Sequence, residues 1–450
     1  MTADTGRLFA AVRTGPWRSA IGRVLAGNVL ARLAALLALA LATVLVARVG
    51  GPDLVGGFTL LRVLPGLAGV LAAVGLPGAA PFFLAATEDA PVVRPTLAVL
   101  TVLGATLGAL GWLLLSPVLR PVFFSHWSPY LTPACACAVF SQLFVAVGKS
   151  LLQGIGDFRG ANLAIVAEEA SFLPMYLVLL PLGRGMGGLL LALVLADLLV
   201  SLGIALRLQQ LRYFRGWRRP NRVLAGQIIG YGGRGQLGGV MSLINLRLDV
   251  AILGALAGPG VLGIYAVASK YAELLRLPGL AVTYVLYPIF SQRSAVAATE
   301  RTRTLIRPAW LVTAAAAVPL AAAAGLVLPA LYGRDFDSAV LPTWILLLGL
   351  VGEGVTGLIT AYLYGIGRPG LNSAAIAIAM LVTVVGDVAL IRPFGVIGAA
   401  VASAVAYLVT TATMLLFFRA QLRAHSETRT KPDVPSGTPD HRTELTAEEG

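Results

Sequence analysis

Several charged side chains occur inside long apolar stretches of this sequence, where ionised groups are rare. An ionised side chain in hydrocarbon costs at least about 2.5–3.5 kcal/mol, so it is expected to face a cavity or an opposite charge. The basic residues that we select on this ground as candidate binding residues are Arg32, Arg62, Arg234, Arg247 and Lys270. A guanidinium group donates two parallel hydrogen bonds to phosphate. These residues therefore predict a site for an anionic group such as a pyrophosphate.

Three acidic residues in apolar stretches, Asp197, Asp249 and Glu273, are candidates for ion coupling or for ion pairs. Asp249 either pairs with a cavity arginine such as Arg247 or binds a coupling cation, and a cap of the outer loop is a structural alternative. Glu273 lies three residues after Lys270, so these two side chains share a helix face and can neutralise each other. Both a functional and a structural interpretation of the acidic set stay open.

A glycine-rich segment surrounds one of the basic candidates. Gly230, Gly232, Gly233 and Gly235 fall within six residues that also contain Arg234. Glycines make a helix easy to bend or unwind, so we expect a hinge here. Close packing of a neighbouring helix against small residues is the alternative interpretation.

The elements that must position these residues are hydrophobic helices. Of the 450 residues, 57% are hydrophobic and 12% are charged, and the mean hydropathy is +0.83. A soluble domain is about 25% charged, so this composition favours lipid as the solvent. The net charge of +13 does not indicate a nucleic-acid-binding protein, because the Lys and Arg residues lie between apolar runs and form no basic polar domain.

Histidine and cysteine usage predicts no metal site. His425 and His441 lie in a polar tail, which leaves only His126 near the apolar stretches. Cys135 and Cys137 are two residues apart in an apolar run, where they diverge around a helix, and this disfavours a disulfide between them.

The apolar runs predict an all-α integral membrane protein. A helix needs about 20 apolar residues to cross the hydrocarbon core, and about twelve such runs are present. The predicted spans are 24–47, 54–76, 95–115, 130–152, 161–182, 185–206, 226–254, 261–285, 306–331, 339–364, 371–392 and 395–418.

Basic residues in the loops predict the orientation. With twelve spans both termini share one side, and that side carries 22 Lys and Arg residues against five on the other. The positive-inside rule then places both termini in the cytoplasm. The predicted organisation is a basic N-terminus (1–23), a six-helix bundle (24–206), a basic cytoplasmic linker (207–223), a second six-helix bundle (224–420) and a disordered tail (421–450).

The two halves of the chain resemble each other at an offset of about 210 residues. The matching patterns pair 51–58 with 258–265, 154–162 with 365–372, and 181–183 with 393–395. A six-helix unit begins and ends on one side of the membrane, so the two repeats are parallel and the substrate site is expected in a central cavity between them. The five basic candidates fall on the first two helices of each repeat.

Sequence motifs along most of the chain match those of a known family. They are ARVGGPDLVGGF (47–58), RLDVAILGALAGPGVLGIYAVA (247–268), PIFS (288–291), LYGRDFDSA (331–339) and IRPFGVIGAA (391–400). In this order they resemble the polysaccharide transport proteins, the Wzx-like oligosaccharide flippases of the multidrug/oligosaccharidyl-lipid/polysaccharide (MOP) exporter superfamily. Arg392 departs from the pattern, since many members have an apolar residue there.

The resemblance implies a transporter and no enzyme, with no cofactor. The implied substrate is an undecaprenyl-pyrophosphate-linked oligosaccharide, moved to the outer leaflet of a bacterial cytoplasmic membrane for cell-surface polysaccharide synthesis. Membrane lipids, and the glycosyltransferases and polymerase of the same pathway, are the implied partners. The alternatives are a cation-coupled multidrug exporter of the same superfamily, which favours an acidic cavity, and a polysaccharide polymerase or ligase, which usually carries a sizeable outer loop. The outer loops here are short.

Overall fold

Helices make up nearly all of the computed structural model, which describes residues 17–86, 90–183, 185–291 and 294–430. The first half contains α2 (Trp17–Ala73), α3 (Leu76–Ala86), α4 (Ala90–Phe123), α5 (Leu131–Gly154), α6 (Phe158–Ala170), α7 (Phe172–Leu179), η1 (Leu180–Leu182) and α8 (Met186–Gln210). Of the predicted basic N-terminus (1–23) and disordered tail (421–450), the structure describes residues 17–23 and 421–430. Both of these stretches are helical, so the helix extends ten residues into the predicted tail.

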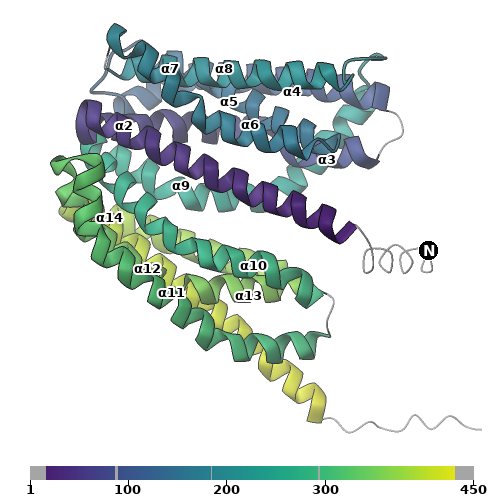
Figure 1. The fold of residues 1–450 in the computed structure, drawn as a ribbon, viewed down its shortest axis with the longest axis vertical. Coiled ribbons are helices and arrows are strands. Elements are labelled where there is room, and N and C mark those ends of the chain that lie inside the picture. Colours follow the sequence, from purple (N-terminus) through teal and green to yellow (C-terminus); the bar gives the residue numbers. More distant parts are fainter. Residues whose placement is uncertain (1–16, 87–89, 184, 292–293, 431–450) are drawn as a thin grey trace, which may run out of the picture.

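The second half repeats this pattern after a short linker. It contains α9 (Arg222–Ala272), η2 (Glu273–Leu275), α10 (Arg276–Ser291), α11 (Ala295–Tyr332), η3 (Arg334–Ala339), α12 (Val340–Leu350), α13 (Glu353–Gly365) and α14 (Pro369–Thr430). We call α2–α8 the N-terminal bundle and α9–α14 the C-terminal bundle. Figure 1 shows them stacked one above the other.

Three of the long helices are broken by a glycine with positive φ. The breaks lie at Gly51 (φ 64°) in α2, Gly258 (φ 82°) in α9 and Gly395 (φ 55°) in α14. A residue without Cβ adopts this conformation at no steric cost. The described residues contain nine apolar helical segments long enough to cross a membrane. Because each break divides one of these segments, the structure confirms the predicted fold of about twelve spans.

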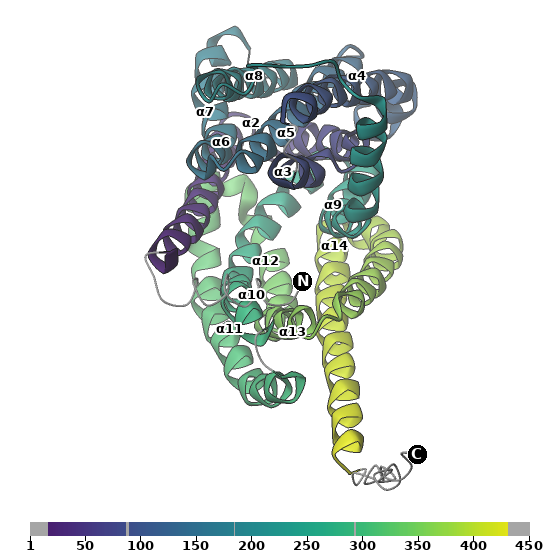
Figure 2. The same ribbon diagram turned by 90° about the vertical axis from the view of Figure 1, so that its right-hand side faces the viewer.

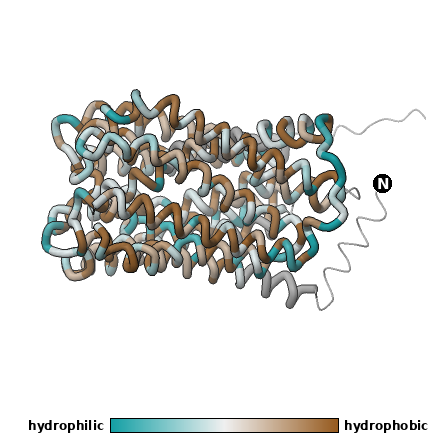
Figure 3. The backbone as a smooth tube through the Cα atoms, turned by 90° about the horizontal axis from the view of Figure 1, so that it is seen from above, coloured by the Kyte–Doolittle hydropathy of each residue, from teal (hydrophilic) through white to brown (hydrophobic). Residues whose placement is uncertain are grey.

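The surface of the described helices is apolar along their length. Figure 3 shows hydrophobic residues along the helices and hydrophilic residues gathered at their two ends. On α4, Leu107, Leu114 and Val118 are exposed by 66%, 80% and 65%. A water-facing surface would not expose three large aliphatic side chains on one helix in this way, whereas a lipid-facing surface does. The chain is therefore a multi-pass membrane protein.

The two bundles meet where the hairpins of α2 and α9 turn. A Cβ atom added at Gly56 would overlap the carbonyl group of Pro259, and one added at Gly263 would overlap the carbonyl group of Pro52. These four residues are equivalent in pairs under the sequence repeat, so the contact is reciprocal. Such close backbone approach between helices requires glycine.

A second close contact lies near the start of α9. A Cβ atom added at Gly232 would come within 2.6 Å of the carbonyl oxygen of Val74, and the ring of Tyr231 stacks on Phe82 at 4.4 Å between centroids. The start of α9 thus packs on the N-terminal bundle, and Tyr265 in its later part contacts Ser403 of α14. In Figure 2 the start of α9 lies on one side of the molecule and the start of α2 on the other.

Candidate functional site

Three of the predicted basic residues line one cavity between the bundles. The cavity has a volume of about 250 Å³ and is lined by Leu39, Thr59, Arg62, Val63, Gly66, Leu67, Val70, Glu169, Arg247 and Lys270. These residues come from both halves of α2, from α6 and from both halves of α9. We call Arg62, Arg247 and Lys270 the cationic cluster.

Arg62 is fixed by an acidic partner in the N-terminal bundle. Its Nη2 donates to both carboxylate oxygens of Glu169, at 2.6 and 2.7 Å. The guanidinium carbon also lies 5.6 Å from the centroid of the Phe58 ring, a distance at which a cation and an aromatic face attract. Only 24% of the Arg62 side chain and 17% of the Glu169 side chain are exposed. Arg62 therefore enters the cavity in a fixed position.

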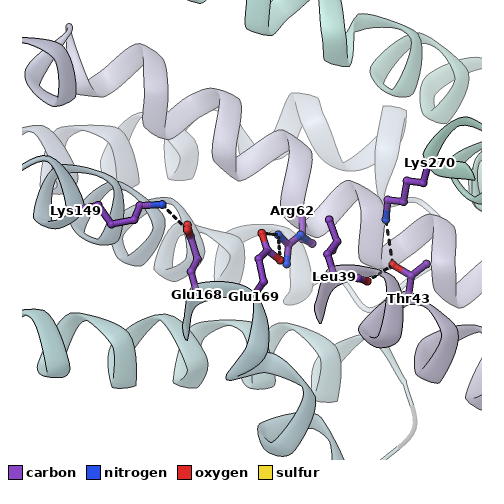
Figure 4. Close-up of polar contacts among 7 residues, drawn as sticks. All are labelled: Leu39, Thr43, Arg62, Lys149, Glu168, Glu169 and Lys270. Carbon is purple, nitrogen blue, oxygen red and sulfur yellow. Dashed lines mark hydrogen bonds and ion pairs between the residues drawn. The ribbon is translucent and has the colours of Figure 1, made fainter. Parts of the chain in front are cut away.

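Lys270 reaches across from the C-terminal bundle to the first span. Its Nζ donates to Thr43 Oγ1 at 3.1 Å, and Thr43 in turn donates to the carbonyl oxygen of Leu39 at 2.8 Å. In Figure 4 this contact and the Arg62–Glu169 pair lie side by side. Among the described residues no carboxylate forms an ion pair with Lys270, Glu273 included. The ammonium group thus has a neutral partner and stays available to a ligand.

The remaining basic candidates lie in different surroundings. Arg247 is half-buried and lines the cavity. Arg32 is exposed and its Nε donates to Asn28 Oδ1 at 3.3 Å. Arg234 is also exposed, and neither Arg32 nor Arg234 lines the cavity just described. The structure therefore brings together three of the five predicted cations.

Asp249 is buried in the C-terminal bundle and, among the described residues, forms no ion pair with Arg247. Its Oδ2 accepts a hydrogen bond from the Tyr265 hydroxyl at 2.5 Å, and its Oδ1 accepts one from the backbone N–H of Val250 at 2.8 Å. The Tyr265 hydroxyl is also 2.8 Å from the Ser403 hydroxyl. Asp249 thus belongs to a polar network that joins α9 to α14.

Asp387, on α14, was not among the predicted site residues. It is fully buried, and neither of its carboxylate oxygens has a hydrogen-bond partner among the described residues. A buried polar group without a partner is rare in native proteins. Its sequence signal is an acidic residue in an apolar run. The sequence does not distinguish Asp387 from other acidic residues of that kind, such as Glu168, that form an ion pair in the folded protein.

A second cavity lies within the N-terminal bundle. It has a volume of about 200 Å³, and its polar lining residues are Arg62, Gln142, Glu168 and Asp197. Asp197, a predicted ion-pair candidate, accepts a hydrogen bond from the Ser141 hydroxyl at 2.8 Å. Glu168 forms an ion pair with Lys149. Arg62 is therefore shared by the two cavities.

Glu168 and Glu169 show what the sequence indicated and what it left open. Two adjacent acidic residues in an apolar run were visible, and adjacent positions on a helix point to different faces. The structure assigns each a separate cation, Lys149 for the first and Arg62 for the second, as Figure 4 shows. The partner of Glu169 lies 107 residues away, so no local pattern identifies it.

The glycine-rich segment of α9 is helical throughout. The four glycines lie in the first part of α9, before the break at Gly258. Gly258 is the only residue within α9 that has non-helical dihedral angles. At Gly232 the close approach of Val74 and Gly75 explains why a side chain is excluded. Hinge motion at these glycines stays a prediction.

Comparison with known sequences identifies the family. A family model described as "Polysaccharide biosynthesis protein" matches residues 45–341, a range that contains the cationic cluster and more than half of the chain. This chain belongs to that family. A relative from Haloferax volcanii, described as a "probable low-salt glycan biosynthesis flippase", is 23% identical over 369 residues, which are 81% of this chain and 76% of the relative.

Comparison with solved structures identifies the fold. An inward-facing multidrug resistance MATE family transporter of the MOP superfamily matches with a TM-score of 0.72 and 19% identity, over 89% of this chain and 99% of that one. The lipid II flippase MurJ in an inward closed conformation matches with a TM-score of 0.70 and 14% identity, over 88% and 87%. These matches show that the chain has the fold of MOP superfamily transporters, as the sequence motifs predicted.

Proposed function

We propose that this protein flips an undecaprenyl-pyrophosphate-linked oligosaccharide from the cytoplasmic to the outer leaflet of a bacterial cytoplasmic membrane, for cell-surface polysaccharide synthesis. The observation that carries the proposal is the cationic cluster, Arg62, Arg247 and Lys270, in one cavity between the two bundles. Membership of a polysaccharide biosynthesis family supports it.

The charge of the cavity favours a pyrophosphate. Glu169 neutralises Arg62, while among the described residues Arg247 and Lys270 form no ion pair. Two uncompensated cations at membrane depth are costly unless an anion visits them. A pyrophosphate provides that anion and matches the planar donors of arginine. The prenyl chain then stays in lipid, and the sugar occupies the wet space between the bundles.

The reciprocal hairpin contact supports alternating access. Gly56 and Gly263 bring the two hairpins into backbone contact at one end of the bundles. We place this closed end at the outer face and both termini in the cytoplasm, as the loop charges predict. The cavity then receives its substrate from the cytoplasmic side, and separation of the hairpins releases it outward.

The orientation has its own test. In a Cys135→Ser/Cys137→Ser background, a single cysteine in the exposed linker, such as Arg215→Cys, should resist a membrane-impermeant thiol reagent in intact cells and react after the membrane is opened. Labelling of this residue in intact cells contradicts the orientation.

Cation-coupled drug efflux is the second candidate, favoured by the similarity of the fold to a multidrug resistance transporter. Cationic drugs would be repelled by Arg247 and Lys270, because like charges in a partly desolvated site disfavour binding. Efflux therefore predicts that neutralising these two residues improves transport, whereas flipping predicts that it impairs transport.

The decisive experiment measures flipping of lipid-linked glycan in cells with Arg247→Gln, Lys270→Gln and the double variant, at matched protein abundance. Loss of one charged hydrogen bond costs about 1.5–3 kcal/mol, so each single variant should lose about tenfold or more of its flipping rate. Arg301→Gln, an exposed residue of α11, is the matched control and should flip normally. Wild-type flipping by the double variant overturns the proposal, and stronger export of a cationic dye favours efflux.

A further inference from the structure

The cavity within the N-terminal bundle is continuous in its lining with the cavity between the bundles. Both are lined by Arg62, Gly66 and Val70 on the second half of α2. A Cβ atom added at Gly66 would lie 3.1 Å from Gln142 Oε1, so the glycine leaves room beside this amide. The two cavities therefore meet at this face of α2, and a ligand group at Arg62 lies beside the second cavity.

The polar groups of this second cavity are suited to receive hydroxyl groups. Gln142, Glu168 and Asp197 come from α5, α6 and α8. Carboxylate and amide oxygens accept hydrogen bonds from hydroxyls, and the amide also donates. Asp197 is 7% exposed, which places a carboxyl acceptor deep in the bundle.

Two of these acceptors are held in place by partners outside the cavity lining. Lys149 pairs with Glu168, and the Ser141 hydroxyl donates to Asp197. Neither Lys149 nor Ser141 lines the cavity. Acceptors oriented in advance lose little freedom when a ligand binds. Leu143, Leu193 and Ala196 give the same cavity an apolar wall, against which the C–H face of a sugar ring can pack.

The charge of this region differs from that of the cavity between the bundles. Arg62 and Lys149, the cations beside this cavity, are each paired with a glutamate, Glu169 and Glu168 respectively. A sugar carboxylate therefore meets no unpaired cation here. The pyrophosphate is thus favoured on the side of Arg62 that faces Lys270, and a second anionic group is disfavoured on the other side.

We infer that the cavity of the N-terminal bundle is the subsite for the sugar joined directly to the pyrophosphate, and that it selects an uncharged or amino sugar over a hexuronic acid. Gln142, Glu168 and Asp197 receive the ring hydroxyls, and a sugar carboxylate finds no counter-charge because Arg62 and Lys149 are already paired. The inference rests on the proposed function. The volume of about 200 Å³ is on the scale of a single ring, so the rest of the oligosaccharide stays outside this cavity.

The test measures binding of three short-chain prenyl pyrophosphates to the purified full chain in detergent. One carries a methyl ester in place of the sugar and is called the bare form, one carries a neutral hexose, and one carries the corresponding hexuronic acid. A hydrogen bond to a charged acceptor is worth about tenfold in affinity. We therefore expect the hexose form to bind about tenfold more tightly than the bare form, and the hexuronic form to lose that gain.

Two variants assign the preference to this cavity. Gln142→Leu should reduce the advantage of the hexose form over the bare form, and Asp197→Asn should reduce the discrimination against the hexuronic form. Gln209→Leu, the same substitution at an exposed position of α8, is the control and should keep the wild-type order of affinities.

The outcomes separate this inference from the proposed function. Equal binding of the bare and hexose forms by the wild-type protein overturns the sugar subsite alone. Absence of binding of the bare form, or binding that Lys270→Gln does not weaken, overturns the proposed function. Loss of flipping by Asp197→Asn with unchanged sugar preference assigns Asp197 to ion coupling and overturns its role in sugar selection.

Discussion

Gly56 and Gly263 occupy equivalent positions in the two repeats, and each lies against the backbone of the other repeat's hairpin. Gly56 meets the carbonyl group of Pro259, and Gly263 meets that of Pro52. The internal repeat, seen first as a recurrence in the sequence, is therefore also a contact on the pseudo-two-fold axis. Arg48 adds to this closed end, donating through Nε to the carbonyl oxygen of Leu331 at 2.8 Å.

Substitution of either glycine by alanine should open this contact. The added methyl group meets a backbone carbonyl, which cannot turn aside as a side chain can. We expect Gly56→Ala and Gly263→Ala to lower export to similar extents and to lower the melting temperature of the purified protein. Gly111→Ala in α4 is the matched control: it has no neighbour within 4 Å, and alanine favours a helix by about 1 kcal/mol. Normal export and melting by both hairpin variants would show that the contact is dispensable.

The Arg62–Glu169 pair should behave as a unit in folding but not in transport. Removal of one partner from a buried pair leaves an uncompensated charge, and the partial exposure of both side chains keeps the cost to about 3 kcal/mol or less. Arg62→Gln and Glu169→Gln should each reduce thermal stability, and the double variant should recover it. Flipping should stay low in the double variant, because the guanidinium at the cavity is absent. Full recovery of flipping would assign Arg62 a purely structural role.

Asp249 should be needed for transport, in keeping with the prediction that it binds a coupling cation. Asp249→Asn keeps the size of the side chain and an acceptor for the Tyr265 hydroxyl, so abundance should stay normal while export falls about tenfold. Tyr265→Phe is the comparison, since it removes the hydroxyl that meets Asp249 and Ser403 and leaves the charge. Equal losses of melting temperature with normal export in both variants would show that Asp249 only supports the network.

The thermal stability of the folded protein should fall in acid because the pair formed by Asp157 and Arg207, in the N-terminal bundle, is lost. Asp157 caps α6 by accepting from the Gly160 N–H at 3.1 Å, and it accepts from Arg207 Nε at 2.7 Å. The Arg207 hydrogen bond is the main reason that the pKa of Asp157 lies below its usual value. A lowered pKa stabilises the folded state above the unfolded pKa, about 3.9, and this contribution is lost as the pH falls through the lowered value.

The measurement compares melting temperatures of the wild type and Asp157→Ala at neutral pH and near pH 3. At neutral pH the variant should be less stable by about 1 kcal/mol, the usual value of a helix cap. The difference should shrink in acid, where the wild-type carboxylate becomes protonated. A difference that does not depend on pH contradicts this assignment.

The amino-acid sequence by itself determined the solvent, the helical class and the hairpin turns of this protein. Apolar runs of about 20 residues require a helix in lipid, because every backbone N–H and C=O group must be paired within the segment. The turns at Gly51, Gly258 and Gly395 follow from local chemistry as well, since glycine adopts positive φ and a proline, which lacks the N–H for a helical hydrogen bond, lies within two residues of each.

Only the tertiary structure decided which charges meet. Lys270 contacts Thr43, 227 residues away, instead of Glu273, and Tyr265 joins Asp249 to Ser403, 138 residues further on. Arg62 and Arg234 looked equally suited to the cavity in the sequence, yet one lines it and the other is exposed. The physical reason is that a hydrophobic run fixes the depth of a residue but not the rotation of its helix. Rotation is set by packing against helices from distant parts of the chain.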